Sequence, residues 1–196
     1  MNLTQKNTKE RIIDVALDFF TRKGFSGVSV REIVEKAGVS KPTLYYYFTN
    51  KEDLYLSLIR NSFLHFNEQL LAITALPADN LRDKLLDITS HYLDFCRKFP
   101  REIKLSLMSI YRTETSAPRV DMARFARPAI AAIADVIGRG IKRGEIKEAD
   151  PVRLALQLLG MIHIQFLIAL QQVDFPLPLS GAKELVETFL TGIESR

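Results

Sequence analysis

The chain has 196 residues, of which 47% are apolar and 26% charged, and this globular composition excludes an intrinsically disordered protein. Its one cysteine, Cys96, cannot form an intrachain disulfide, so we expect a reducing, cytoplasmic setting. The net charge of +4 is concentrated in residues 1–60, where ten Lys and Arg oppose seven Asp and Glu. That modest excess fits a polyanionic partner, and it fits an ordinary basic surface equally well.

The first fifty residues are predicted to form three short helices. No apolar run precedes the first, so we expect no secretory signal. Its apolar residues recur at i, i+3 and i+4, and it ends at residues 22–24, where two cations precede a glycine. A capping box of Ser29 and Glu32 begins the second helix. Ser40 caps the third, with Pro42 in its first turn.

The second and third helices are joined by residues 37–39 only, which indicates a helix-turn-helix. The later helix of such a pair enters the major groove of DNA. Leu44 is expected to face the core, so tyrosines 45–47 spread over the remaining faces and can donate to phosphate oxygens. For the last tyrosine, packing between helices is an equal alternative. Lys41 and Thr43 begin this helix and are placed to reach base edges.

The rest of the chain also shows helical periodicity. Further helices are predicted at residues 51–75, 80–99, 101–112, 119–143, 151–172 and 180–194. A kink or a late start is expected at Pro128. The sequence therefore predicts an all-α fold of about nine helices. Residues 1–50 form a helix-turn-helix DNA-binding domain, and residues 51–196 form a larger helical ligand-binding and dimerisation domain.

Residues 154–173 contain no charged side chain, and three interpretations compete. The length suits a membrane span, but repeated Gln and His residues would be costly in lipid. The wide apolar face suits a four-helix bundle across a two-fold axis, built with the final helix. The expected interface residues are Leu156, Leu159, Gly160, His163, Leu167, Leu170, Phe189 and Leu190. Alternatively, part of the helix lines a ligand cavity.

Aromatic, methionine and glutamine side chains supply the candidate ligand-binding residues. They are Phe63, Phe66, Met108, Tyr111, Phe125, Gln165 and Phe166. Such residues at helical spacing are more often core than pocket. The low charge of this part of the chain favours an apolar or aromatic ligand.

No pattern indicates catalysis or metal binding. The three histidines, His65, His91 and His163, lack metal-ligand spacing, and neither CxxC nor HExxH occurs. We therefore expect no metal, no cofactor and no enzymatic activity. The alternative class is a helical enzyme or small-molecule-binding protein that does not act on DNA.

Residues 8–54 resemble the N-terminal domain of the TetR (tetracycline-repressor) family. The resemblance is carried by a first helix that ends in KGF, by SVREIVEKAGVS, and by TLYYYF followed by NKEDL. It implies a homodimeric transcriptional regulator, usually a repressor, that binds a pseudo-palindromic operator in double-stranded DNA. In the family a small-molecule effector usually releases the protein from its operator. The glutamines and the histidine within residues 154–173 argue against a membrane partner.

Carried over by position, the resemblance implies roles in DNA binding for residues of three helices. They are Ser29 and Arg31, then Ser40, Lys41, Pro42, Thr43, Tyr45, Tyr46 and Tyr47, and finally Lys51. Val34 departs from the family pattern, where alanine is more usual. The later residues match the family only in helical period and length. The resemblance therefore names no effector, operator or regulated gene, and does not separate repression from activation.

Overall fold

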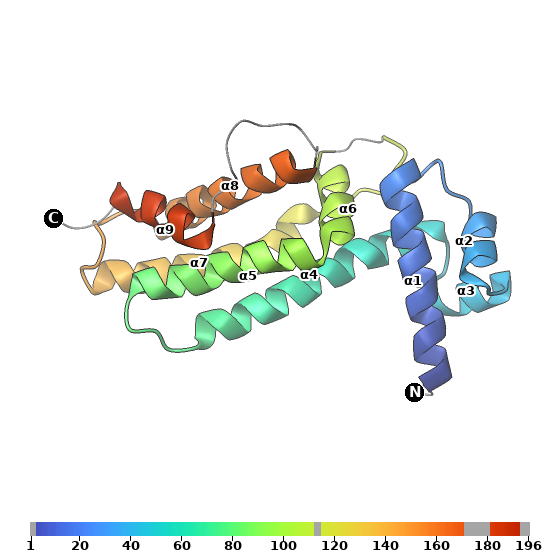
Figure 1. The fold of residues 1–196 in the computed structure, drawn as a ribbon, viewed down its shortest axis with the longest axis horizontal. Helices are drawn as coiled ribbons and strands as arrows, with labels where there is room; N and C mark the ends of the chain where they lie inside the picture. The colour runs from blue at the N-terminus through green and yellow to red at the C-terminus, as the bar shows by residue number, and fades with distance from the viewer. Residues whose placement is uncertain (1–2, 112–114, 171–180, 193–196) are drawn as a thin grey trace. The chain divides into compact units, whose positions relative to one another are not determined.

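A computed structural model describes residues 3–111, 115–170 and 181–192 of the chain (Figure 1). Nine helices occur in these ranges, which confirms the predicted all-α class. Their bounds are α1 (Leu3–Lys23), α2 (Val30–Ala37), α3 (Lys41–Tyr47), α4 (Lys51–Ala75), α5 (Leu81–Lys98), α6 (Pro100–Ile110), α7 (Met122–Lys142), α8 (Pro151–Leu170) and α9 (Ala182–Thr191). None of them, within the described residues, combines the length and apolar character that crossing a bilayer requires.

Most helix boundaries lie within about three residues of the predicted ones, which is the usual uncertainty at helix ends. Helix α7 differs in one respect, because Pro128 lies inside it and the helix begins at Met122. The late start that we considered is therefore not observed. The predicted ends of the last two helices fall outside the described residues.

The chain packs as two compact units. Unit 1 comprises residues 1–63 and 100–122, and unit 2 comprises residues 64–99 and 123–196. Unit 1 thus contains α1, α2, α3, the first half of α4, and α6. This division follows packing, and the functional division at residue 50 stays a prediction.

The core of unit 1 draws one or more apolar side chains from each of its helices. Ile12, Ile33, Leu44 and Leu54 are fully buried, and Leu105 of α6 joins them. Helix α3 contributes only Leu44 as a buried residue. Because a helix of seven residues has little stability of its own, its position depends on this side chain and on its cap.

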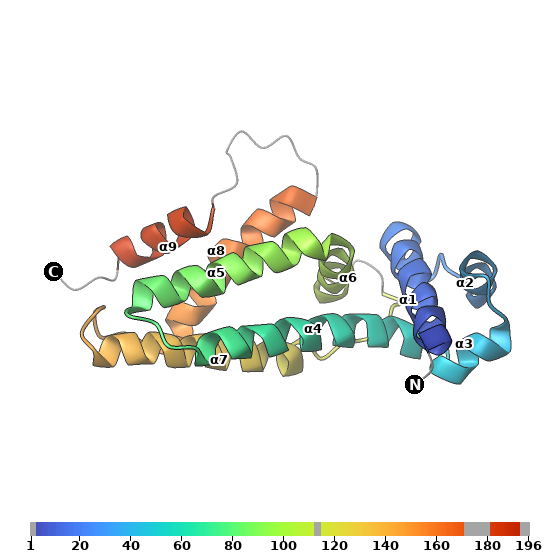
Figure 2. The same ribbon diagram turned by 60° about the horizontal axis from the view of Figure 1, so that its bottom comes forward.

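Unit 2 is built on the packing of α5 against α9 and α8, and α8 and α9 also contact each other. Figure 2 shows the same ribbon from a second direction. Helix α7 approaches α5 closely at Gly140, where an added Cβ would lie 2.6 Å from Leu81 Cδ2. The backbone N–H of Leu81 also donates to Glu145 Oε2 at 2.5 Å, which fixes the start of α5.

Candidate nucleic-acid interface

Helix α2 begins with the capping box that the sequence predicted. The Glu32 N–H donates to Ser29 Oγ at 3.2 Å, and the Ser29 N–H donates to Glu32 Oε2 at 2.9 Å. Lys23 Nζ adds a bond of 2.7 Å to Glu32 Oε1, and with both Ser29 groups it lowers the pKa of Glu32 to about 2. The helix ends at Gly38, whose φ of 63° lies in the left-handed region that favours glycine. The residues at its two ends therefore determine where helix α2 begins and ends.

The Glu32→Gln variant is expected to have a lower Tm than the parent at neutral pH, and the gap should narrow on acidification. Folding lowers the pKa of this carboxyl, so its stabilisation is complete above the unfolded value of 4.5. It is lost as the pH falls through the folded value of about 2. Thermal unfolding followed by circular dichroism at several pH values tests this. Glu10→Gln is the control, and a gap that stays constant with pH would contradict the prediction.

Helix α3 presents its side chains as expected for a recognition helix. Leu44 is 0% exposed, whereas Tyr45 is 49% and Tyr46 is 73% exposed. Tyr47 is half-buried, and its ring meets that of Tyr46 edge to face, with centroids 5.0 Å apart. Lys41, at the start of the helix, is exposed. The rings of Tyr45 and Tyr46 and the nearby side chain of Lys41 are thus exposed at the surface of the protomer. An exposed aromatic surface of this kind is typical of a binding site.

The N-cap of α3 involves two of the predicted DNA-binding residues. Ser40 Oγ accepts from the Thr43 N–H at 3.2 Å and lies 2.8 Å from Thr43 Oγ1. Pro42 occupies the first turn, where its missing N–H costs nothing. The cap therefore restrains the side chain of Thr43 through Ser40.

Arg31 on α2 is exposed and already has a partner. Its Nε lies 2.7 Å from Glu35 Oε1 one turn later, and this hydrogen bond raises the pKa of Arg31. Exposed i, i+4 ion pairs contribute little to stability. A phosphate could therefore replace the carboxylate at small cost.

Lys51 makes contacts that sequence reasoning missed. Its ammonium donates to Phe25 O at 3.0 Å and to Val28 O at 2.9 Å, and lies 4.2 Å from the centroid of the Phe25 ring. The Phe25 ring in turn meets Tyr55 edge to face at 5.2 Å. Lys51 therefore ties the first turn of α4 to residues 24–28, the loop after α1. Its predicted phosphate contact stays a prediction, and two of the three ammonium hydrogens are already used.

All the predicted DNA-binding residues lie in unit 1. Ser29, Arg31, Ser40, Lys41, Pro42, Tyr45 and Tyr46 are exposed, and Thr43, Tyr47 and Lys51 are half-buried. They lie at the start of α2, along α3 and at the start of α4, and α2 packs against α3. The exposed members could meet a polyanion without any change in the core of the unit.

The predicted ligand-binding residues are divided between the two units. Unit 1 holds Phe63, Met108 and Tyr111, and unit 2 holds Phe66, Phe125 and Gln165. The side chain of Phe166 lies outside the described part of the structure. Phe63 packs against the core of unit 1, and Tyr111 is exposed. These residues therefore belong to different environments.

Phe66 belongs to a packed aromatic cluster in unit 2. Its ring centroid lies 5.4 Å from that of His91, 4.7 Å from Tyr92 and 5.1 Å from Phe95. The Tyr92 hydroxyl lies 2.8 Å from His163 Nε2. Phe66 is thus a core residue in this state.

Several buried polar atoms near α4, α5 and α8 have no hydrogen-bond partner among the described residues. They are Asn67 Oδ1, Thr89 Oγ1, His91 Nε2 and Gln165 Oε1. An unsatisfied buried polar group costs free energy, so each would gain from a bound water or ligand atom. Nδ2 of Asn67 already donates to the Phe125 carbonyl oxygen at 2.9 Å.

Helix α8 carries an exposed stripe made of three apolar residues, one glycine and one histidine. It comprises Val152, Leu156, Gly160, His163 and Ile164. Sequence reasoning named the middle three and missed Val152 and Ile164. We call these five residues the α8 stripe.

The other predicted interface residues lie elsewhere. Leu159, Phe189 and Leu190 are buried in the core of their own protomer, because α9 turns its apolar face onto α5 and α8. They are therefore core residues and are not carried into the proposed interface. Leu167 is half-buried, and the side chain of Leu170 lies outside the described residues.

Known proteins match this chain over both parts. "Bacterial regulatory proteins, tetR family" matches residues 12–58, and "Tetracyclin repressor-like, C-terminal domain" matches residues 77–178. The HTH-type transcriptional regulator YdeS of Bacillus subtilis is 26% identical over 194 residues, covering 97% of this chain and 91% of the relative. The fatty acid metabolism regulator protein of Bacillus subtilis is 28% identical over 158 residues, covering 80% of each chain.

A solved structure shares the fold. The transcriptional regulator FadR from Bacillus subtilis in complex with stearoyl-CoA gives a TM-score of 0.73 at 22% identity, covering 95% of this chain and all of that one. Residues 77–178 alone are more than half of the chain, and residues 12–58 contain the capped helices and the exposed tyrosines described above. On these grounds the chain belongs to the TetR family of bacterial transcriptional regulators, as its first fifty residues had suggested.

Proposed function

We propose that the chain is a ligand-responsive repressor that binds a pseudo-palindromic operator as a homodimer. A small apolar or aromatic effector releases it from DNA, and it acts in the cytoplasm. The observation that carries this proposal is the surface of α3, where Tyr45, Tyr46 and Lys41 are exposed around one buried anchor, Leu44.

Helix α3 would lie in the major groove of the operator. Its seven residues span about 10 Å, so one copy can contact only a few base pairs. Lys41, Thr43 and Tyr45 would read base edges, while Arg31 and Tyr46 would bind phosphates. Two copies on half-sites about 34–36 Å apart, or a near multiple, would supply the remaining specificity.

The α8 stripe supports dimerisation. Leu156 is 50% exposed in the protomer, and a Cβ added at Gly160 would meet no described atom within 4 Å. Leucine, isoleucine and valine side chains spaced in this way can pack against the same residues of a second copy across a two-fold axis. Dimerisation would place two recognition helices on one duplex.

The Leu156→Asp variant is expected to be monomeric, and its affinity for an operator duplex should fall by roughly 100-fold or more, because a buried unpaired carboxylate is strongly destabilising. Light scattering on a sizing column and fluorescence anisotropy measure the two effects. Leu71→Asp is the matched control, since Leu71 is also an exposed leucine of unit 2 but lies on α4. A dimeric Leu156→Asp variant would rule out the α8 stripe as the interface.

An apolar effector is supported by two observations. Six of the seven predicted ligand-binding residues have aromatic or methionine side chains. One relative is a fatty acid metabolism regulator, and the FadR structure holds stearoyl-CoA. An effector can shift the balance between free and DNA-bound forms only by its difference in affinity for them, typically about 1–3 kcal/mol.

Selection of duplexes from a random library tests the whole proposal. We expect an enriched pseudo-palindrome, bound by two protomers, with an affinity that falls steeply with salt. A purified protein that is monomeric and binds no duplex at low ionic strength would contradict it. Chemical turnover without affinity for DNA would favour the alternative class of a helical enzyme.

A further inference from the structure

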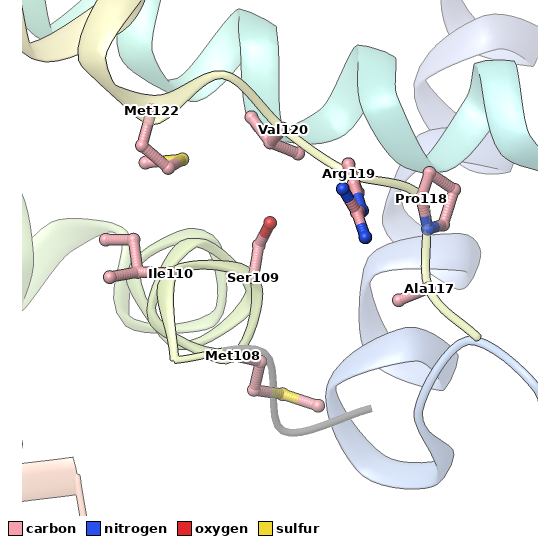
Figure 3. A pocket seen from close by; sticks show the side chains of 8 residues that line it. All are labelled: Met108, Ser109, Ile110, Ala117, Pro118, Arg119, Val120 and Met122. Atoms are coloured by element: carbon pink, nitrogen blue, oxygen red, sulfur yellow. The ribbon is translucent and has the colours of Figure 1, made fainter. Parts of the chain in front are cut away.

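Unit 1 contains a cavity of about 160 Å³ next to the helix-turn-helix (Figure 3). It lies between the end of α6 and residues 117–122. A cavity of about 150 Å³ is large enough for one benzene molecule, so a compound of one ring or a short chain would fit. Among the predicted ligand-binding residues, Met108 lines this cavity.

The walls of the cavity are mostly apolar. Met108, Ile110, Val120 and Met122 supply flexible or branched hydrocarbon surface. Methionine adapts its shape to irregular ligands, because it is unbranched and its sulfur is polarisable. The body of a ligand bound here should therefore be apolar.

Two polar side chains extend into the same space from opposite walls. Ser109 projects from α6 and Arg119 from the facing segment (Figure 3). Within the described part of the chain, Arg119 makes no ion pair and the residues that line the cavity include no carboxylate. A guanidinium and a hydroxyl together suit a carboxylate, which accepts hydrogen bonds from both.

A further polar atom lies on the same face of α6. Ser106 precedes Ser109 by three residues, so both side chains point to one side of the helix. Ser106 is buried, and its Oγ has no partner among the described residues. Ser106 does not itself line the cavity, so Ser109 is the residue of α6 whose hydroxyl is available to a ligand there.

The outer wall of the cavity is connected to the DNA-binding helices. Ala117 and Val120 pack against the core of unit 1, and Ser116 Oγ lies 2.5 Å from Ser26 Oγ. Ser26 belongs to residues 24–28, the loop whose carbonyls accept from Lys51. A ligand that displaces residues 117–122 would therefore also displace residues 24–28, the loop that leads into the helix-turn-helix.

We infer that this cavity binds a small organic carboxylate with an apolar body of about one ring, and that the bound ligand lowers the affinity for DNA. The inference rests on the proposed function and adds the site and chemical class of the effector. The charged group interacts with Arg119 and Ser109, and the body contacts the methionines.

The test is an amide NMR titration of the full-length protein with benzoate, and with benzamide as the neutral molecule of the same shape. Benzoate should shift the amides of residues 108–110, 117 and 119–122 saturably, and should bind about tenfold more tightly than benzamide. Arg119→Gln should remove this difference by weakening benzoate alone. Lys104→Gln is the control, because it removes a cation from α6 outside the cavity, and it should change neither titration.

Shifts confined to unit 2, or equal binding of the two compounds by the parent, would overturn the cavity assignment. Equal benzoate affinity in Arg119→Gln and parent would do the same. Duplex affinity is measured separately, without and with saturating benzoate. An unchanged affinity with benzoate bound would overturn the effector role. A parent protein that binds no duplex would contradict the proposed function, whereas the titration would still decide whether the site exists.

Discussion

Replacing Lys51 by methionine is expected to lower the Tm by about 4–8 °C and to weaken binding to every duplex. The ammonium of Lys51 donates to the carbonyls of Phe25 and Val28. Hydrogen bonds from a charged group contribute about 1.5–3 kcal/mol each when buried, and those of the half-buried Lys51 should together contribute about 2 kcal/mol. For a chain of this size each kcal/mol shifts Tm by about 2–4 °C. Thermal unfolding and anisotropy with an operator duplex measure both effects.

Lys41→Met is the matched control for Lys51→Met. It removes the same charge from unit 1, but Lys41 is exposed, so DNA affinity should fall while Tm stays unchanged.

The salt dependence of binding separates the two roles of Lys51. A phosphate contact would lower the slope of log K against log salt by about 0.9 in Lys51→Met. A purely structural lysine would leave the slope as it is, and an unchanged Tm would exclude the structural role.

Leu44→Ala is expected to reduce the free energy of unfolding of unit 1 by about 3 kcal/mol and to abolish sequence-specific binding. Truncating a buried leucine costs about 2–5 kcal/mol, and Leu44 is 0% exposed. It is also the buried residue that holds α3 on the core. Without it, the recognition helix would lose its fixed orientation. Urea unfolding followed by circular dichroism, together with duplex titration, tests the prediction.

Tyr46→Ala is the control for Leu44→Ala. It removes a larger apolar side chain from the same helix, but Tyr46 is 73% exposed, so stability should change by less than about 0.5 kcal/mol. Duplex affinity should still fall, because the phenol lies on the proposed DNA surface. Equal loss of stability in the two variants would mean that Leu44 does not anchor α3.

The helices could be predicted because their signals are local. Ser29 with Glu32, Ser40 with Pro42, and Gly38 act over at most four residues, and all take their expected places in caps. The directions of tyrosines 45–47 could be predicted because neighbouring side chains on a helix point about 100° apart and Leu44 was assigned to the core.

Contacts between distant residues could not be predicted in this way. Lys51 meets carbonyls 23 and 26 residues away, and Ser26 meets Ser116, which is 90 residues away. No periodicity links such pairs. Electrostatic reasoning assigned Lys51 to an external anion, whereas backbone carbonyls of the chain itself already accept two of its hydrogens.

The faces of α8 were ambiguous for a different reason. This helix has apolar residues on almost every side, so the sequence pattern could not show which side packs against the other helices of the same protomer. In the structure α8 packs against both α5 and α9; Leu159 is buried, whereas Val152 and Ile164 are exposed. The ligand-binding residues were ambiguous likewise, since Phe66 and Met108 are similar in apolarity but one is core and the other lines a cavity.

Unit 1 is discontinuous along the chain, and this limits how its parts can be exchanged. A chimera that joins residues 1–63 to the sensory half of another regulator would omit α6 and residues 117–122. The apolar surface that Leu105, Ala117 and Val120 cover would then be open to water. A hybrid should therefore retain residues 100–122 as well, so that the core of unit 1 stays covered and the cavity proposed to bind the effector is kept.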